Sequence, residues 1–109
     1  MSYKLSVTHW FESQAKRLRK KYPSLKNDLE TLFASLMEVP VQGTSLGKSC
    51  YKIRLAIKSK GKGKSGGARV ITHVHVTETT VYLLDIYDKS EQDTISDAEL
   101  DALLALIKD

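Results

Sequence analysis

The residues of this sequence that could do chemistry gather in one cationic segment, residues 48–69, which holds eight lysines and arginines and no aspartate or glutamate. Its first part alternates as a β-strand does, with Lys52, Arg54 and Lys58 on one side and aliphatic residues on the other. One side of such a strand would face a core, and the other would present positive charge. Because arginine and lysine bind phosphate through charge-assisted hydrogen bonds, the segment predicts an anion-binding face.

A basic loop follows this strand, in which Lys60, Lys62 and Lys64 alternate with glycine and serine. We expect it to hold a nucleic-acid backbone, and an ordinary disordered hairpin loop is the alternative. The triplet Gly63-Lys64-Ser65 does not predict a nucleotide-binding loop, because that motif needs a glycine where Lys58 stands. It also needs a helix directly after the serine, and a strand is expected there instead.

The chain returns on a strand that carries Arg69, His73 and His75 on the side opposite Val70 and Val74. The two histidines could bind a metal or act as an acid–base pair, but no further cysteine or histidine is spaced to complete a zinc site. We interpret them as bystanders, with proton donation to a leaving oxygen as the second interpretation. The sequence therefore predicts no metal site and no cofactor.

The elements that must position these residues can be read from apolar periodicity and capping signals. Trp10, Phe11, Ala15 and Leu18 form the apolar stripe of a first helix, and Pro23 separates it from a second one. The expected fold is α+β, a small antiparallel sheet with an N-terminal helical hairpin on one face, the other face free, and a C-terminal helix. We expect a strand at 3–7, helices at 9–21 and 24–37, a loop to residue 49, strands at 50–58, 68–77 and 80–87, and a helix that begins at the capping box Ser96-Asp97-Ala98-Glu99.

Length and charge limit the class of protein. The 109 residues fit a single domain, residues 1–109. The one cysteine, Cys50, is expected in a reducing, cytoplasmic location, and no apolar run is long enough to cross a membrane. The net charge of +4 is segregated, with +3 in residues 1–47, +8 in residues 48–77 and −7 in residues 78–109. A focused positive surface of this kind indicates a nucleic-acid or acidic partner.

Two strings resemble a known family. Residues 51–71, YKIRLAIKSKGKGKSGGARVI, and residues 81–91, VYLLDIYDKSE, are similar to the HigB-like branch of the RelE/ParE superfamily, the toxins of bacterial type II toxin–antitoxin pairs. The resemblance implies a small antiparallel sheet with two N-terminal helices on one face. RelE-like members cut mRNA in the ribosomal A site with the RNA 2′-hydroxyl as nucleophile, whereas ParE-like members poison DNA gyrase.

The resemblance also implies roles for individual residues. Lys52 and Arg54 match the basic residues of the second family strand, and Lys52 would be the general base. Arg69 matches an arginine on the scissile phosphate, and Lys89 matches a basic residue that serves as acid or phosphate contact. Some members carry a tyrosine a few residues after that lysine; Ile95 stands there.

The RNA-binding surface that follows from these expectations combines the loop lysines with one aromatic side chain. Tyr87 is expected to take over base stacking, and the lysines are expected to hold ribosomal RNA or the mRNA backbone. The set is Lys58, Lys60, Lys62, Lys64 and Tyr87.

The predicted function is therefore a toxin that acts as a ribosome-dependent mRNA endoribonuclease without a metal, and that a cognate antitoxin protein neutralises. The alternatives are a ParE-like gyrase inhibitor and a non-catalytic RNA-binding module.

Overall fold

The computed structural model describes residues 2–107, and it shows the predicted α+β fold. A short strand, β1 (Lys4–Val7), leads into α1 (His9–Lys21), which Thr8 caps by accepting a hydrogen bond from the backbone of Phe11. Phe11, Ala15 and Leu18 of α1 are buried, as their spacing predicts. Trp10 departs from the predicted stripe, because 46% of it is exposed.

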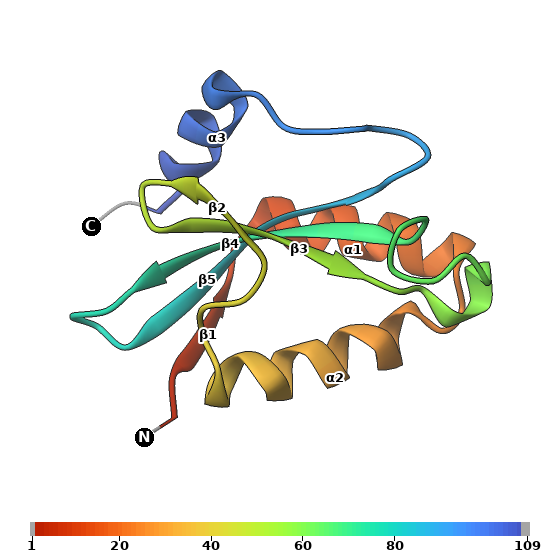
Figure 1. The fold of residues 1–109 in the computed structure, drawn as a ribbon, viewed down its shortest axis with the longest axis horizontal. Coiled ribbons are helices and arrows are strands. Elements are labelled where there is room, and N and C mark those ends of the chain that lie inside the picture. The colour runs from red at the N-terminus through yellow and green to blue at the C-terminus, as the bar shows by residue number, and fades with distance from the viewer. Residues whose placement is uncertain (1, 108–109) are drawn as a thin grey trace.

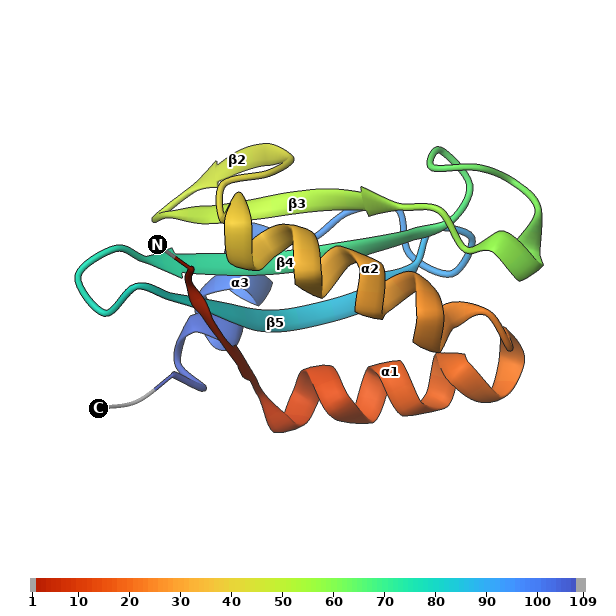
Figure 2. The same ribbon diagram turned by 90° about the horizontal axis from the view of Figure 1, so that it is seen from below.

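The second helix, α2 (Leu25–Glu38), completes the predicted hairpin. Its leucines recur every three or four residues, so they share one side of the helix, and that side is buried. The buried leucines are Leu25, Leu29, Leu32 and Leu36. In Figure 2 this helix lies in front of the sheet, with α1 beside it.

The sheet has five strands in the order β1-β5-β4-β3-β2. The C-terminal four are antiparallel to their neighbours: β2 (Thr44–Gly47), β3 (Cys50–Leu55), β4 (Ala68–His75) and β5 (Thr80–Asp88). Two details differ from the expectation. β1 pairs with β5 in parallel, and β2 forms where a loop was expected.

Two apolar clusters lie on opposite faces of the sheet. The larger one packs α1 and α2 against the strands. The smaller one packs Leu100 and Leu103 of α3 (Asp97–Leu104) against Cys50, Ile71 and Leu84. Figure 1 shows α3 above the sheet and α2 below it. The face that was expected to be free is therefore partly covered, because the leucine side of α3 needs an apolar partner.

The end of the sheet nearest the α1–α2 turn carries the basic loop. β3 ends at Leu55, earlier than the predicted residue 58, and a single 3₁₀ turn, η1 (Lys58–Lys60), follows it. The predicted capping box of α3 is present, with Ser96 and Glu99 exchanging hydrogen bonds. Among residues 2–107, no helix has the length and apolarity that a membrane crossing requires.

Candidate functional site

The pairing of three strands brings most of the predicted site residues into two neighbouring rows. Arg54 of β3 lies opposite Arg69 of β4, and Arg69 lies opposite Tyr87 of β5. In the adjacent row, Lys52 lies opposite Ile71. These side chains share the α3 side of the sheet, so the face predicted from alternation does exist.

Lys52 and Arg54 are the accessible cations of this face. Arg54 is exposed and Lys52 is half-buried. Neither side chain makes a hydrogen bond or ion pair within residues 2–107, so both can meet an external anion. Both also line a groove of about 540 Å³ between the edge of β3 and α2.

Arg69 takes a different position from the one expected. Only 4% of it is exposed. Its guanidinium donates hydrogen bonds to the backbone oxygens of Lys64 at 3.0 Å, Ser65 at 3.1 Å and Ala68 at 3.1 Å. Arg69 therefore holds the backbone of the basic loop in place and adds positive charge to the α3 side of the sheet. Its guanidinium is not free to bind a phosphate through two parallel hydrogen bonds.

Lys89 lies directly after β5, where its backbone N–H donates to the oxygen of Gly67 at 3.0 Å. Its ammonium pairs with Asp93, an exposed carboxylate that the sequence reasoning did not single out. The hydrogen bond from Lys89 lowers the pKa of Asp93, and the charges of Lys89, Lys52 and Arg69 lower it further. Three of the four predicted catalytic cations thus act on one anionic group.

The predicted loop lysines separate into two kinds. Lys58, Lys62 and Lys64 are exposed, and their ammonium groups have no partner within residues 2–107. The side chain of Lys60 is only 9% exposed and forms an ion pair of 2.6 Å with Asp88. The predicted RNA contact does not fit Lys60, because its charge is already neutralised inside the protein.

Tyr87 is buried, and this corrects its predicted stacking role. Only 2% of it is exposed, and it packs in the cluster beneath α3 with Ile71 and Leu84. Its hydroxyl has no hydrogen-bond partner within residues 2–107, and burial raises its pKa. A base could stack on this ring only after the covering segment had moved.

The histidines lie at the far end of β4 from Arg69. His73 is 3.6 Å from the thiol of Cys50, and burial lowers the pKa of His73. His75 accepts a hydrogen bond from the backbone of Glu78 at 3.2 Å. Within residues 2–107, no group of three or more histidine, cysteine, aspartate or glutamate side chains is arranged to hold a metal ion.

Buried acidic residues are the part of the site that sequence reasoning missed. Asp88 accepts hydrogen bonds from Tyr22, Lys60 and Ser90, and these bonds hold its pKa far below the usual range although burial opposes them. The only sequence signal was the position of Asp88 directly after a run of apolar strand residues.

Comparisons with known proteins agree with this architecture. A family model described as the RelE toxin of the RelE / RelB toxin-antitoxin system matches residues 4–109. A mutant of the E. coli toxin RelE in the free state is similar, with 16% sequence identity, a TM-score of 0.66, and coverage of 99% of this chain and 100% of that one.

Two toxin–antitoxin complexes are also similar. The intact E. coli RelBE complex shows 18% identity and a TM-score of 0.61, over 80% of this chain and 96% of that one. The RelBE2 complex of Mycobacterium tuberculosis shows 15% identity and a TM-score of 0.57, over 81% of this chain and 99% of that one. At these sequence identities, the structural similarity shows a shared fold and nothing more.

Proposed function

Because the chain belongs to the RelE toxin family, and so is the toxin component of a toxin–antitoxin pair, we propose that it is an endoribonuclease that cuts mRNA on the ribosome. The substrate would be the phosphodiester backbone of mRNA, and the nucleophile would be the RNA 2′-hydroxyl. The assignment to a HigB-like branch of the superfamily stays a prediction.

The convergence of cations on one exposed anion supports this proposal most directly. The charges of Lys89, Lys52 and Arg69 all lower the pKa of Asp93, although 85% of its side chain is exposed. Arg54 lies in the row beside Lys52 with its guanidinium unpaired within residues 2–107. A phosphate that displaced the Asp93 carboxylate would meet the same positive field, which is what the transition state of phosphoryl transfer needs.

The proposed reaction needs neither a metal ion nor a protein nucleophile. The 2′-oxygen would attack the adjacent phosphorus while Lys52 takes the 2′-proton. The bond from phosphorus to the 5′-oxygen would then break, and Lys89 would give that oxygen a proton. The products would be a 2′,3′-cyclic phosphate and a free 5′-hydroxyl.

The two arginines would have different roles in this reaction. Arg54 would contact the phosphate oxygens directly, because its side chain is exposed. Arg69 would act as a positioning residue, because its hydrogen bonds hold the backbone of Lys64 and Ser65. Few acid–base groups are available on this face, so much of the rate would come from alignment of the RNA by the ribosome.

The proposed partners follow from this chemistry. In the cytoplasm, mRNA and ribosomal RNA would contact the basic face, which is formed by Lys52, Arg54, Arg69 and Lys89, and the exposed lysines Lys58, Lys62 and Lys64. The second partner is an antitoxin protein, which the family and the similar complexes support.

A cell-free translation reaction tests the proposal, with mRNA 5′ ends mapped by primer extension. The wild-type protein should cut only when ribosomes are present, at a fixed place within codons. Arg54→Gln should slow cutting by about 10²–10³-fold, as expected for loss of one group that stabilises transition-state charge. Lys4→Gln, on the distant strand β1, serves as the control that lowers net charge equally.

Two results would contradict the proposal. Intact mRNA in every reaction would show that the protein is not a nuclease, and would favour a gyrase inhibitor or a non-catalytic RNA-binding module. Cutting of naked mRNA at the same rate would show that the ribosome contributes no alignment.

A further inference from the structure

A second basic run lies outside the face described above. Residues 16–26, KRLRKKYPSLK, hold six lysines and arginines and no acidic residue. They form the last turns of α1 and the start of α2, on the helical layer of the molecule. Cations in the last turn of a helix offset the helix dipole, but this run continues past the turn into the next helix.

The fold holds this run against the basic loop. Ser24, at the start of α2, donates its backbone N–H to the hydroxyl of Ser59 at 3.2 Å and accepts the backbone N–H of Ser59 at 2.8 Å. Asp28 accepts the backbone N–H of Lys58 at 3.2 Å and the hydroxyl of Ser24 at 2.8 Å. Two segments more than thirty residues apart therefore present one surface, and Figures 1 and 2 both show them at the same end of the molecule.

A buried ion pair makes the same junction rigid. The carboxylate of Asp88 accepts the hydroxyl of Tyr22 at 2.5 Å and the ammonium of Lys60 at 2.6 Å. Tyr22 directly follows α1, Lys60 ends η1, and Asp88 ends β5. This contact ties the helical hairpin, the basic loop and the sheet together at one point.

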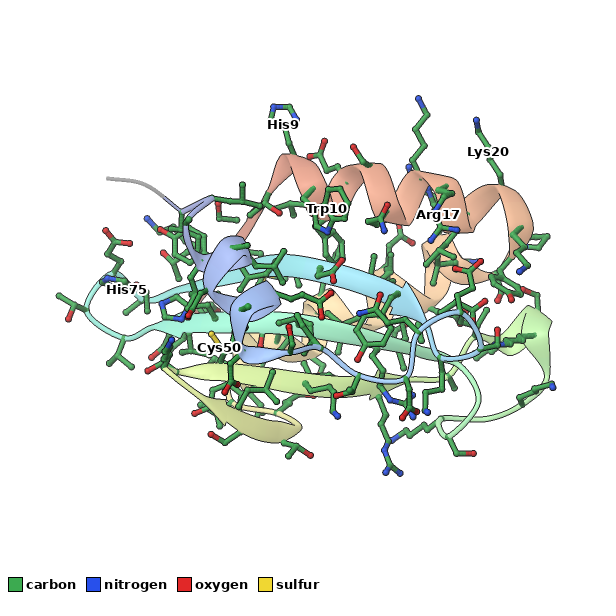
Figure 3. All side chains as sticks on the ribbon, turned by 90° about the horizontal axis from the view of Figure 1, so that it is seen from above. His9, Trp10, Arg17, Lys20, Cys50 and His75 are labelled. Atoms are coloured by element: carbon green, nitrogen blue, oxygen red, sulfur yellow. The ribbon has the colours of Figure 1, made fainter. Side chains whose placement is uncertain are left out.

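The cations that remain on the outside are accessible. Arg17 and Lys21 are engaged by Glu91, at 3.1 and 3.8 Å. In Figure 3, Lys20 points away from the sheet, whereas Arg17 lies toward it. Within residues 16–26 and 58–64, the exposed cations without a hydrogen bond or ion pair to any residue of 2–107 form what we call the basic end; they are Lys16, Arg19, Lys20, Lys26, Lys58, Lys62 and Lys64.

The chemistry of the basic end favours a nucleic-acid backbone over a protein. Protein interfaces centre on buried apolar and aromatic anchors, whereas a polyanion needs only positive charge. The exposed large apolar side chains of residues 2–107 all lie elsewhere: Val7, Trp10, Met37, Val39, Val41, Val76 and Leu106. The groove between α1 and α2 has an apolar floor, but Val7, its exposed apolar member, lies beyond the opposite end of α1.

The same surface favours a duplex over a single strand. Proteins hold single strands by stacking bases on aromatic side chains, and Tyr22, the aromatic residue of this junction, is buried. Duplex RNA is recognised instead by its shape and its phosphates. We infer that the basic end is a docking surface for the phosphate backbone of duplex RNA; the choice of RNA over DNA rests on the proposed function.

Fluorescence anisotropy with a labelled RNA duplex of about 16 base pairs tests this inference, because a duplex of that length spans two grooves. The triple variant Arg19→Gln, Lys20→Gln and Lys26→Gln removes three charges with residues of similar helix propensity. The slope of log K against log salt should fall by about 2–3, since each phosphate contact contributes about 0.9. The dissociation constant should rise at least tenfold at about 0.1 M salt.

Two matched variants control for folding and for net charge. Arg19→Lys, Lys20→Arg and Lys26→Arg keep every charge and should bind with the wild-type slope. Lys4→Gln with Lys48→Gln removes two charges far from the basic end and should leave the slope within about half a unit of wild type. Circular dichroism on each variant shows that the helices remain.

A triple variant that keeps the wild-type slope would overturn the inference. Tighter binding of a DNA duplex of the same sequence, or of polyglutamate, would overturn it in favour of another partner. The anisotropy measurement is made without ribosomes, so loss of mRNA cutting in the translation assay would count against the nuclease alone.

Discussion

Replacing Asp85 with asparagine should stabilise the protein at neutral pH. Asp85 is 6% exposed and lies on β5, where the register of pairing with β4 shifts. Its carboxylate accepts the indole N–H of Trp10 at 2.9 Å. Burial raises its pKa to about 6, against smaller opposing contributions from Trp10 and the backbone N–H of Ile86, and the charge of Glu99 on α3 adds to the rise.

The direction of the pH effect follows from linkage. The folded protein holds the Asp85 proton more tightly than the unfolded chain does, so the free energy of unfolding falls as pH rises from about 4 to about 6. A pKa of about 6 in place of 3.8 corresponds to about 3 kcal/mol, at about 1.4 kcal/mol per unit. Above about pH 6, the ionised Asp85 lowers the free energy of unfolding by this full amount.

Asparagine keeps the carbonyl oxygen that accepts the Trp10 N–H, and it carries no charge to bury. Asp85→Asn should therefore gain about 2–3 kcal/mol at pH 7, slightly below the full value because the new amide N–H groups need partners. The gain should be about 2 kcal/mol smaller at pH 4.5, where the folded wild-type carboxyl is largely protonated. Urea unfolding of both proteins between about pH 4.5 and pH 7.5 measures the difference.

The lower limit of pH 4.5 excludes the titration of Asp88 from the measurement. Asp88 contributes stability that is lost only at lower pH, because its folded pKa is depressed. Glu99→Gln is the control, since Glu99 is exposed and its removal should change the profile little. A difference between Asp85→Asn and wild type that is zero at pH 7, or constant across the range, would refute the reasoning.

Three further predictions concern the basic loop and its neighbours. Lys60→Met should destabilise the fold by about 3–5 kcal/mol in urea unfolding, because the buried Asp88 carboxylate loses the ammonium 2.6 Å away and keeps only the more distant Lys21, at 3.9 Å. A variant with the wild-type free energy of unfolding would contradict this. Gly67→Ala should lower the melting temperature, because a Cβ there would lie 2.1 Å from the backbone oxygen of Leu55, and an unchanged melting curve would show that the strand end yields. Asp93→Asn should tighten binding of a short single-stranded RNA in anisotropy assays, by releasing the lysine it pairs with, and weaker binding would show that the carboxylate does not compete with phosphate.

Local patterns were sufficient to predict the helices and the core strands. The alternation of Ile53 and Leu55 with Lys52 and Arg54 placed the aliphatic side toward the helices and the basic side away from them, as found. Those expectations needed only the periodicity of a strand, which the residues carry individually.

Long-range pairing is what the sequence could not supply. The strand at Thr44–Gly47 has no apolar alternation and exists because β3 offers it a free edge. The residues around Lys60 are those of an exposed loop. Only the contact of three chain segments around Asp88 shows that the Lys60 side chain is buried. Tyr87 could be placed beneath α3 only once the packing of that helix was known.

The parallel pairing of β1 with β5 has a consequence for synthesis of the chain. Lys4 lies opposite Thr80, and Val7 lies opposite Leu83, so β1 is paired only by β5, a strand made more than seventy residues later. At about 5–20 residues per second, the roughly eighty residues between them take about 4–16 s to translate. During that interval β1 has no strand to pair with, and β4 lacks its neighbour β5. The nascent chain therefore cannot complete the sheet that carries Lys52, Arg54 and Arg69 until β5 has been translated.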